Sequence, residues 1–381
     1  MPCKAHSGCS SSPPPTHTHL LLLRTCRKML WTLDKASRLL FWCGPSFLLA
    51  GILKVAIHLS FGMTFASSFL VLGGLYLLVA SFEIKAKGKA VLVTGCDSGF
   101  GHALAQRLDS LGFRVFAGCL RAHEEGAQRL QFSASSRLHV LQLDITKEEQ
   151  VNKALQEVKV LLSPREELWG VVNNAGISTF GAVEWTPLQT FQDVASVNIF
   201  GHIRVIKAFL PLIRNSKGRV VTVTSAEGLF TSPFVAAYDL TKHAMEGFAD
   251  CLRHEMQRFG VHVCIVEPGN YTAGTKLNTS ERAKKLGQSL WSDMTEEVRH
   301  AYGRETFARV VSSMENVTNT GLVDLTTAVN AMVEALTQRF PQARYTCMDL
   351  KLYIRGLVAQ HMPEWIYDFF YINEVRNTWY S

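Results

Sequence analysis

Hydrophobic residues run almost without interruption between positions 39 and 82. Val55 to Phe82 contains no Asp, Glu, Lys or Arg, and it is longer than the ~20 apolar residues that cross a bilayer. Lys54 separates this run from a second apolar stretch, Leu39 to Leu53. The pattern predicts a transmembrane anchor over residues 39–82, built as one long helix or as two.

Residues 87–273 show a different pattern, in which short apolar runs alternate with helical periodicity. The predicted strands are Ala90–Thr94, Arg114–Gly118, Leu138–Leu143, Trp169–Asn173, Gly218–Ser225 and Val261–Glu267. The helix after Tyr238 is predicted to bury one apolar stripe, formed by Leu240, Ala244, Phe248, Leu252 and Phe259. Strand–helix alternation predicts an α/β fold with a doubly wound parallel sheet of the Rossmann type.

Two further segments follow this region. Residues 274–340 are helical in pattern and charged, and the family resemblance described below implies that they form a substrate lid within a domain that spans 87–340. Residues 341–381 form a tail rich in aromatic side chains, among them Trp365, Tyr367, Phe369, Phe370, Tyr371, Trp379 and Tyr380. This tail is predicted either to pack on the core as a helix, or to cap the substrate mouth or contact the membrane interface.

The charge of the chain supports a membrane anchor rather than a nucleic-acid surface. The net charge is +7, and many basic residues precede the anchor: Lys4, Arg24, Arg27, Lys28, Lys35 and Arg38. Residues 1–38 are therefore predicted to be a disordered basic flank, with the true start left open between Met1 and Met29. Lys85, Lys87 and Lys89 flank the other side, so the positive-inside rule predicts a hairpin with both ends cytosolic.

The nine cysteines are scattered and form no Cys-x-x-Cys pair or Cys/His cluster. This usage indicates a reducing compartment and predicts neither structural disulfides nor a metal site. A cleaved signal peptide is not expected, because the apolar run begins too late and is too long.

A glycine-rich turn follows the first predicted strand. Thr94-Gly95-Cys96-Asp97-Ser98-Gly99-Phe100-Gly101 stands between Val91–Val93 and the helical stretch Ala103–Leu111. Glycines allow a tight turn and a close backbone approach, and the N-terminus of the following helix faces the pyrophosphate of a dinucleotide. The spacing is Gly-x-x-x-Gly-x-Gly, and in this context it predicts a dinucleotide site.

A second pattern carries proton chemistry. Tyr238 and Lys242 stand four residues apart on a predicted helix, so their side chains share one face, and Ser225 precedes Tyr238 by thirteen positions. A nearby lysine favours the tyrosinate and lowers the phenol pKa from about 10 toward working pH. A phenol tuned in this way can move a proton to or from an alcohol oxygen, which the serine hydroxyl can also bind.

Together with Asn173-Asn174-Ala175-Gly176, Asn198 and Pro268-Gly269, these motifs resemble the short-chain dehydrogenases/reductases over about Lys87 to Ala273. The resemblance implies that Tyr238 is the acid/base, that Ser225 stabilises the substrate oxygen, and that Lys242 holds the nicotinamide ribose. It implies that Asn198 holds a water in a proton relay. Besides Tyr238 and Lys242, it assigns cofactor binding to Gly95, Asp97, Ser98, Gly99, Phe100, Gly101, Asp144, Asn174, Ala175, Gly176, Pro268 and Gly269.

The cofactor is predicted to be NAD(H). The position where many NAD enzymes carry an acid for the ribose hydroxyls is Cys119, so that acid is absent. Arg121 stands past the usual place for a residue that binds the 2′-phosphate of NADP(H). Asp97, in the glycine turn, would repel that phosphate.

Two subfamilies are resembled in different places. Asn173–Gly181 and Glu267–Asn270 look like the mitochondrial D-3-hydroxybutyrate dehydrogenases. The apolar N-terminus and four other segments look like type 2 17β-hydroxysteroid dehydrogenase, namely Gly101–Leu104, Leu108–Gly118, Asp144–Thr146 and Ile366–Phe370. The retinol dehydrogenases belong to the same membrane-anchored branch.

The residues around the expected site favour a lipophilic substrate. A carboxylate would need a buried cation or several donors, yet the only charge between Ser225 and Tyr238 is Glu227. A steroid-like secondary alcohol of the 17β-hydroxysteroid type is therefore preferred, with D-3-hydroxybutyrate and retinol as alternatives. The lid contains cations that keep the hydroxy acid open: Lys276, Arg282, Lys284 and Lys285.

The steroid-type resemblance implies an endoplasmic reticulum membrane with a cytosolic catalytic domain. The hydroxybutyrate alternative implies the mitochondrial inner membrane, for which the acid-poor, Arg-containing N-terminus could serve in import. A homodimer is left open, and no nucleic-acid partner is expected. A non-enzymatic NAD-binding scaffold is the alternative of another class, against which the complete Asn198, Ser225, Tyr238 and Lys242 set argues.

Overall fold

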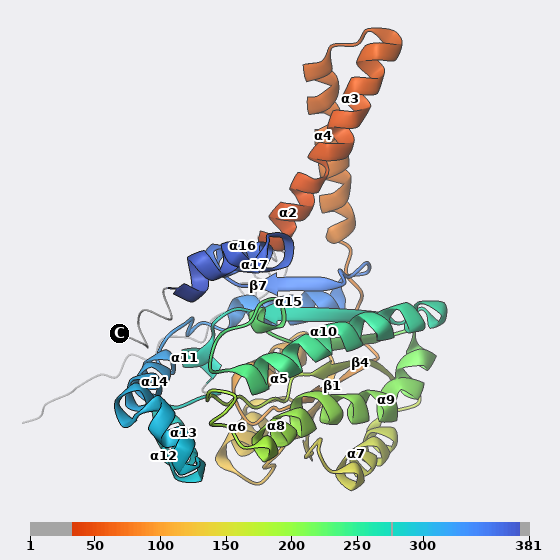
Figure 1. Ribbon diagram of the computed structural model, residues 1–381. Coiled ribbons are helices and arrows are strands. Elements are labelled where there is room, and N and C mark those ends of the chain that lie inside the picture. Colours follow the sequence, from red (N-terminus) through yellow and green to blue (C-terminus); the bar gives the residue numbers. More distant parts are fainter. Residues whose placement is uncertain (1–32, 276, 374–381) are drawn as a thin grey trace, which may run out of the picture. The chain divides into compact units, whose positions relative to one another are not determined.

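The computed structural model describes residues 33–275 and 277–373 (Figure 1). Seven strands form one sheet in the order β3-β2-β1-β4-β5-β6-β7, and every neighbouring pair is parallel. The strands are β1 Lys89–Thr94, β2 Arg114–Cys119, β3 Leu138–Gln142, β4 Glu167–Asn173, β5 Arg219–Val223, β6 His262–Pro268 and β7 Arg344–Cys347. The predicted doubly wound parallel sheet is confirmed. Its order reverses between β1 and β4, and ligands of such sheets bind at that reversal.

The six strands predicted from sequence are present, with ends that differ by a few residues. The seventh, β7, lies within the segment that was expected to be a tail, 341–381. It has only four residues, and it becomes a strand by pairing with β6. A run this short carries little periodicity of its own, so its sequence alone did not reveal it.

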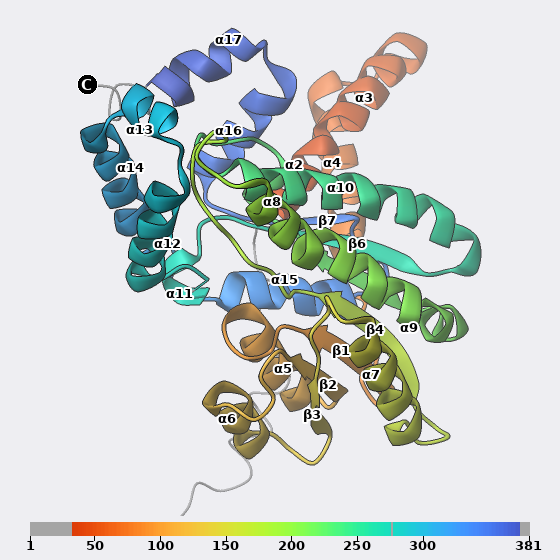
Figure 2. The ribbon, with the colours of Figure 1, turned by 60° about the horizontal axis from the view of Figure 1, so that its bottom comes forward.

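Helices cover both faces of the sheet (Figure 2). One face packs against α5 Gly99–Ser110, α6 Glu125–Ser133 and α15 Thr326–Thr337. The other packs against α7 Glu148–Leu161, α9 His202–Ser216 and α10 Ala236–Met256. Within β1, Val91 and Val93 belong to the first core and Ala90 and Leu92 to the second. This alternation is the mark of a strand buried on both sides.

Helix α10 is present as predicted, but its predicted buried stripe is wrong at two of its positions. Leu240 is 56% exposed and Ala244 is also exposed, whereas Met245 and Ala249 are buried. The buried face carries polar residues near the sheet edge, including Lys242. Apolar periodicity alone therefore predicted burial of the neighbouring face of α10. Of the other predicted positions, Leu252 is buried, Phe248 is half-buried, and Phe259 lies beyond the helix in the short turn η3 Gln257–Phe259.

A separate small core supports the region expected to be a lid. The helices are α11 Thr272–Thr275, α12 Ser280–Asp293, α13 Glu296–Tyr302 and α14 Arg304–Val317. Helices α12, α13 and α14 pack on the loop after β4 and the loop before α10 through a cluster that includes Phe180, Trp185, Phe234, Leu290 and Phe307. The expected lid, 274–340, also contained α15, but that helix is fully buried against the sheet at Ala328, Met332 and Leu336. The lid proposal therefore applies to α11–α14 alone.

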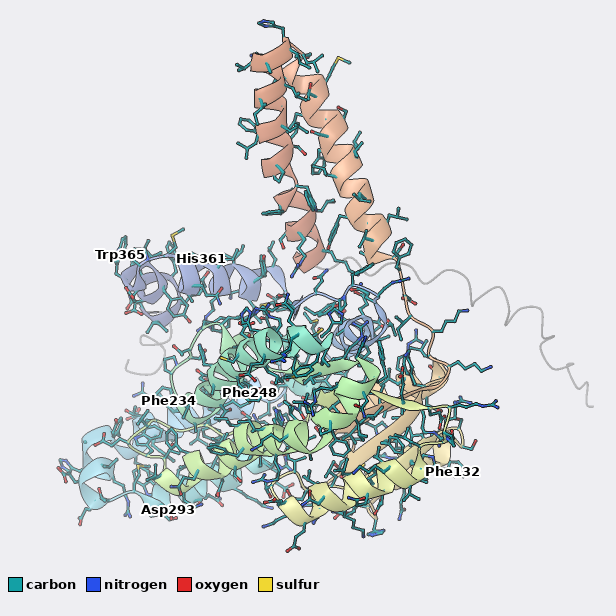
Figure 3. All side chains as sticks on the ribbon, turned by 90° about the vertical axis from the view of Figure 1, so that its right-hand side faces the viewer. Phe132, Phe234, Phe248, Asp293, His361 and Trp365 are labelled. Atoms are coloured by element: carbon teal, nitrogen blue, oxygen red, sulfur yellow. The ribbon has the colours of Figure 1, made fainter. Side chains whose placement is uncertain are left out.

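The C-terminal segment packs on the core, as the first of the two alternatives predicted, and it also exposes aromatic side chains. It folds as α16 Leu350–His361, α17 Glu364–Tyr367 and the π-turn η4 Asp368–Ile372. Tyr367 is buried in a cluster with Phe230, so the segment packs on the core. Trp365 is 70% exposed on the outer side (Figure 3), and Phe369 and Phe370 are exposed as well. Trp379 and Tyr380 lie outside the described residues.

The N-terminal part contains α2 Leu33–Phe41, α3 Cys43–Ile57 and α4 Phe61–Ala80. Helices α3 and α4 lie side by side (Figure 1). Lys35–Ile57 and Phe61–Ala80 are each long and apolar enough to cross a membrane. Of the two predicted forms of the anchor, one long helix or two, the structure has two helices, because the turn at residues 58–60 interrupts the uncharged run. The flank expected to be disordered, 1–38, is helical from Leu33, and residues 1–32, with both candidate start methionines, lie outside the described residues.

A third helical stretch, Leu188–Ser216, is also long and apolar enough to span a membrane by composition. It comprises α8 Leu188–Ala195, the π-turn η1 Ser196–Gly201 and α9. Val205, Phe209 and Ile213 of α9 are fully buried against the sheet. This stretch therefore belongs to the folded domain.

Several contacts join the anchor to the domain. The Lys35 ammonium pairs with Glu334 of α15 at 2.8 Å, and Gln342 donates to the Tyr76 hydroxyl of α4 at 3.2 Å. The chain after α4 continues as a bridge along the end of α15, where Ile84 N donates to Thr337 O at 2.7 Å. Both legs of the hairpin are thus bonded to the same end of the domain.

Candidate active site

The glycine-rich turn has the shape that a pyrophosphate requires. Gly95 and Gly99 have φ values of 71° and 59°, in the left-handed region that favours glycine, and α5 begins at Gly99. A Cβ atom at Gly101 would overlap the Gly95 carbonyl oxygen and lie 2.6 Å from Asn174 Nδ2. The turn therefore closes tightly over the N-terminus of α5, and its backbone is available to an anionic ligand.

The loop after β4 is locked to this turn. Asn174 Nδ2 donates to Thr94 O at 2.9 Å and to Gly95 O at 3.1 Å. In return, the Thr94 hydroxyl accepts from Asn174 N at 3.0 Å and from Ala175 N at 3.1 Å. Gly176 follows in the same loop, near Asn198. The two strand ends at the reversal of the sheet are thus fixed as one unit, and Thr94, which the sequence showed only as the first residue of the glycine-rich motif, helps to build the site.

Asp97 fixes the neighbouring loop. Its two carboxylate oxygens accept from Leu120 N and Arg121 N, each at 2.9 Å, immediately after β2. Cys119 is fully buried at the end of β2, and Arg121 pairs with Glu124 at 3.2 Å. Asp97 therefore has a structural task in addition to the repulsion that the sequence suggested.

The remaining residues expected to bind cofactor lie at the carboxyl ends of strands or at the start of α5. Asp144, after β3, accepts from Thr146 N at 2.9 Å and from its hydroxyl at 2.7 Å. Ser98 is the N-cap of α5, and Phe100 packs edge-on against Tyr271. Pro268 ends β6, and Gly269 N donates to Cys347 O at 3.0 Å.

Ser225, Tyr238 and Lys242 come together from β5 and α10. Ser225 caps the short turn η2 Ala226–Gly228, where its hydroxyl accepts from Glu227 N at 3.2 Å, and it is hydrogen-bonded to the Tyr238 hydroxyl. Lys242 Nζ lies 5.3 Å from the centre of the Tyr238 ring and donates to Val223 O at 3.1 Å. The spacing of the motif therefore produces the expected cluster.

The electrostatics of this cluster differ from the sequence expectation. Burial raises the pKa of Tyr238, the Glu227 carboxylate adds to the rise, and the hydrogen bond from Ser225 opposes it. Burial also lowers the pKa of Lys242 to about 8, against the opposing effects of Glu246 and Glu227. Desolvation thus outweighs the lysine's attraction for the tyrosinate, which the sequence argument had not weighed.

Asn198 lies in the π-turn η1, and its side chain is fully engaged. Its Oδ1 accepts from Ile177 N at 2.9 Å, and its Nδ2 donates to Ile177 O at 2.9 Å and to the Thr241 hydroxyl at 3.0 Å. The side chain thus ties the loop after β4 to α10. The family resemblance implies that Asn198 holds a relay water. Such a water would have to bind to a main-chain atom of Asn198 rather than to its side chain.

Three charged or titratable groups near the site gave no clear signal in the sequence. His202 is fully buried, its Nε2 lies 2.6 Å from Ala175 O, and burial lowers its pKa to about 4. Asp239 and Arg355 lie beside Glu227, which the sequence showed only as an isolated charge. Arg355 comes from α16, far along the chain, so only the fold brings it to the site.

The lid cations do not form a carboxylate site among the described residues. Lys284 pairs with Glu315 at 3.6 Å and Lys285 with Glu281 at 2.8 Å, and both lysine side chains are exposed. Arg282 donates to Leu277 O at 3.3 Å. Lys276 lies outside the described residues. Within residues 33–275 and 277–373, no group of three His, Cys, Asp or Glu side chains could hold a metal ion.

Comparison with known proteins agrees with this geometry. A family model described as short chain dehydrogenase matches residues 89–286. D-beta-hydroxybutyrate dehydrogenase, mitochondrial, from Mus musculus is 44% identical over 297 residues, which cover 77% of this chain and 87% of that protein. Retinol dehydrogenase 7 from Mus musculus is 38% identical, covering 74% of this chain and 86% of that protein. The 17-beta-hydroxysteroid dehydrogenase type 6 of Homo sapiens is 38% identical, covering 74% and 87%.

A solved structure supports the fold. The short-chain dehydrogenase from Streptomyces avermitilis superposes with a TM-score of 0.59 at 24% identity, covering 77% of this chain and 99% of that chain.

Proposed function

The chain belongs to the short chain dehydrogenase family, and we propose that it is a membrane-bound, NAD-dependent dehydrogenase of a lipophilic, steroid-like secondary alcohol. The observation that carries the proposal is the Ser225, Tyr238 and Lys242 cluster beside a closed glycine turn. Dehydrogenase activity on alcohols and the use of NAD(H) follow from the family. The substrate, the site roles and the compartment belong to the proposal.

In this mechanism Tyr238 takes the proton of the substrate hydroxyl during oxidation and returns it during reduction. Ser225 binds the same oxygen and holds it at the phenol. Lys242 holds the ribose hydroxyls, and its charge supports the tyrosinate. When bound, NAD supplies the hydride acceptor for the alcohol carbon. Because the pKa of Tyr238 is raised, oxidation should speed up as the pH rises.

The cofactor side of the site supports NAD(H) over NADP(H). A 2′-phosphate would lie near the loop that Asp97 holds, where the carboxylate repels it. The one arginine in that loop, Arg121, is paired with Glu124. The glycine turn is so tight that a Cβ atom at Gly101 would fill it. This shape fits the pyrophosphate.

The substrate side supports a neutral, apolar alcohol. Phe230 and Phe234, between Ser225 and Tyr238, are both buried. Glu227 stands in the same loop, and an unpaired substrate carboxylate beside it would be strongly disfavoured. The described lid cations are exposed and engaged with other groups.

A hydroxy acid is the second candidate. The observation that favours it is the 44% identity with the mitochondrial D-beta-hydroxybutyrate dehydrogenase. Retinol is a third substrate class, suggested by the 38% identity with retinol dehydrogenase 7. The non-enzymatic alternative is a scaffold module that binds NAD without turnover. Such a module does not need the cluster of side chains around Tyr238.

A substrate panel separates these candidates. Membranes that contain the protein are incubated with NAD and with estradiol, 3-hydroxybutyrate or retinol, and NADH formation is followed by its fluorescence. We expect turnover of estradiol and little of 3-hydroxybutyrate, because the loop between Ser225 and Tyr238 is apolar and carries an anion. Turnover of 3-hydroxybutyrate alone would overturn the substrate proposal. If no alcohol yields NADH while NADH still binds, the scaffold alternative holds.

The anchor is proposed to be a two-helix hairpin that keeps the catalytic domain on the cytosolic face of the endoplasmic reticulum. Lys54 lies in the last turn of α3, close to the turn of the hairpin, so its ammonium can reach the far interface. Lys35 and Arg38 on one leg and Lys85, Lys87 and Lys89 after the other favour a cytosolic side for both ends.

Membrane extraction tests this topology. We expect the full chain to resist alkaline carbonate extraction, because both legs are apolar, whereas a variant without residues 1–80 is released. This deletion keeps Phe82 and Ile84, which bond to the end of α15. Protease added to sealed microsomes should digest the domain of the full chain. A protected domain would instead support a lumenal or mitochondrial location and would favour the hydroxy acid.

A further inference from the structure

Two carboxyl groups meet beside Tyr238. Glu227 comes from the turn η2 after β5, and Asp239 comes from the first turn of α10. Their side chains are hydrogen-bonded to each other. Ionised carboxylates only accept hydrogen bonds, so such a bond requires a proton on one of them.

The setting of Asp239 makes that proton necessary. Asp239 is 2% exposed, and its Oδ2 accepts from Ser232 N at 2.8 Å. Its Oδ1 is buried and receives no N–H or O–H donor from the described residues. A buried carboxylate oxygen without a donor is costly, and a proton shared with Glu227 removes that cost.

A cation from the C-terminal segment, Arg355, acts on both carboxyl groups. The Arg355 guanidinium donates to Thr231 O at 3.2 Å and to the Ser232 hydroxyl at 3.0 Å, and it lies 4.3 Å from the centre of the Phe230 ring. These contacts hold its charge beside both carboxyl groups. Two carboxyls with one proton carry one negative charge, which Arg355 balances.

Other titratable groups face the pair from the elements packed around it. Lys242 and His243 lie on α10, and both favour an ionised Glu227. Tyr238 and Tyr367 are the neighbouring phenols; burial is the main cause that raises the pKa of each, and the carboxylates add to the rise. Burial is the largest cause that raises the pKa of Glu227, and it also raises that of Asp239 to about 8.

We propose that Glu227 and Asp239 form a one-proton carboxyl pair that sets the pH range in which Tyr238 can act, with Arg355 as its counter-charge. The proposal rests on the function proposed above, in which Tyr238 is the acid/base. Glu227 and Asp239 act through Tyr238 and are positioning residues. When the pair loses its proton, a second negative charge arises next to the phenol, and the tyrosinate that oxidation requires becomes less favourable.

The pH profile of alcohol oxidation tests the pair with two isosteric variants. Glu227→Gln removes the charge that acts most strongly on Tyr238, so the rising limb of kcat/KM should move to lower pH by about one unit, a roughly tenfold gain in the tyrosinate fraction. Asp239→Asn leaves Glu227 ionised without a shared proton. The rising limb of kcat/KM of this variant should therefore stay in place or move to higher pH. Glu281→Gln, which alters an exposed lid carboxylate, is the control and should match the wild type.

Shifts of opposite sign, or a shift in Glu227→Gln alone, support the proposal. A purely structural role would lower kcat in both variants without moving either limb, and that result would overturn it.

An infrared difference spectrum tests the shared proton without any turnover. The full chain at pH 7 should show a protonated carboxyl C=O band that is missing from both Glu227→Gln and Asp239→Asn and that shifts in heavy water. If the wild type lacks this band, the pair is refuted, whatever Tyr238 does. If the band is present but Tyr238→Phe keeps full activity, the proposed function fails while the shared proton stands.

Discussion

Replacement of Tyr238 by phenylalanine should reduce alcohol turnover by at least about a hundredfold, because general acid–base groups contribute ~10²–10⁴-fold. The substitution removes only the hydroxyl, which is hydrogen-bonded to Ser225, and leaves the ring beside Lys242. NADH binding should therefore stay near the wild-type level. The measurements are the rate of NADH formation with the best alcohol of the panel and a fluorescence titration with NADH.

Tyr353→Phe provides the matched control, since Tyr353 lies on α16 and packs at the edge of the C-terminal cluster. Its activity should remain within about twofold of the wild type, as expected for a surface-type change of under about 0.5 kcal/mol. Residual activity of Tyr238→Phe above about one hundredth of the wild type would remove Tyr238 from the acid/base role.

Gly101→Ala should weaken NADH binding by about tenfold to a hundredfold. The added methyl group would overlap the Gly95 carbonyl oxygen and lie 2.6 Å from Asn174 Nδ2, so the turn and the β4 loop must move apart. Overpacking of this kind costs about 1–3 kcal/mol, and each ~1.4 kcal/mol lost from binding is a factor of ten. The dissociation constant of NADH and the thermal midpoint are both measured.

Gly247→Ala is the control for this substitution, because it also lies in a helix, α10, and a Cβ atom there has nothing within 4 Å. It should bind NADH normally and unfold at the same or a slightly higher temperature. If Gly101→Ala binds NADH as tightly as the wild type, the glycine turn is not the pyrophosphate site.

Sequence was informative wherever local chemistry repeats at short range. The glycine turn, the loop of Asn174 and the step from Tyr238 to Lys242 each lie within a few residues, and their geometry follows from one strand end or one helical turn. The strands before β7 were also recognisable, because strands buried on both faces are continuous apolar runs. The residues that come together at the candidate site could therefore be named before the fold was known.

Properties that depend on tertiary burial could not be predicted in the same way. The raised pKa of Tyr238 results from desolvation, and no motif states how deeply a side chain is buried. Asp97 was interpreted by its charge, yet it bonds to Leu120 N and Arg121 N, which lie in the loop after β2. Arg355 reaches the loop before Tyr238 only because α16 packs there. Helix α15 lies within the segment that was expected to be the lid, but it packs on the sheet.

The bonds at the base of the hairpin restrict how the domain moves. Lys35 is paired with Glu334, and the chain after α4 is bonded to the end of α15, so both legs hold the same part of the domain. A body held at two points rotates about the membrane normal and diffuses laterally, but it does not tumble freely. For a substrate dissolved in lipid, encounter then becomes a two-dimensional search, in which the ratio of substrate to lipid, rather than the volume of water, sets the working concentration.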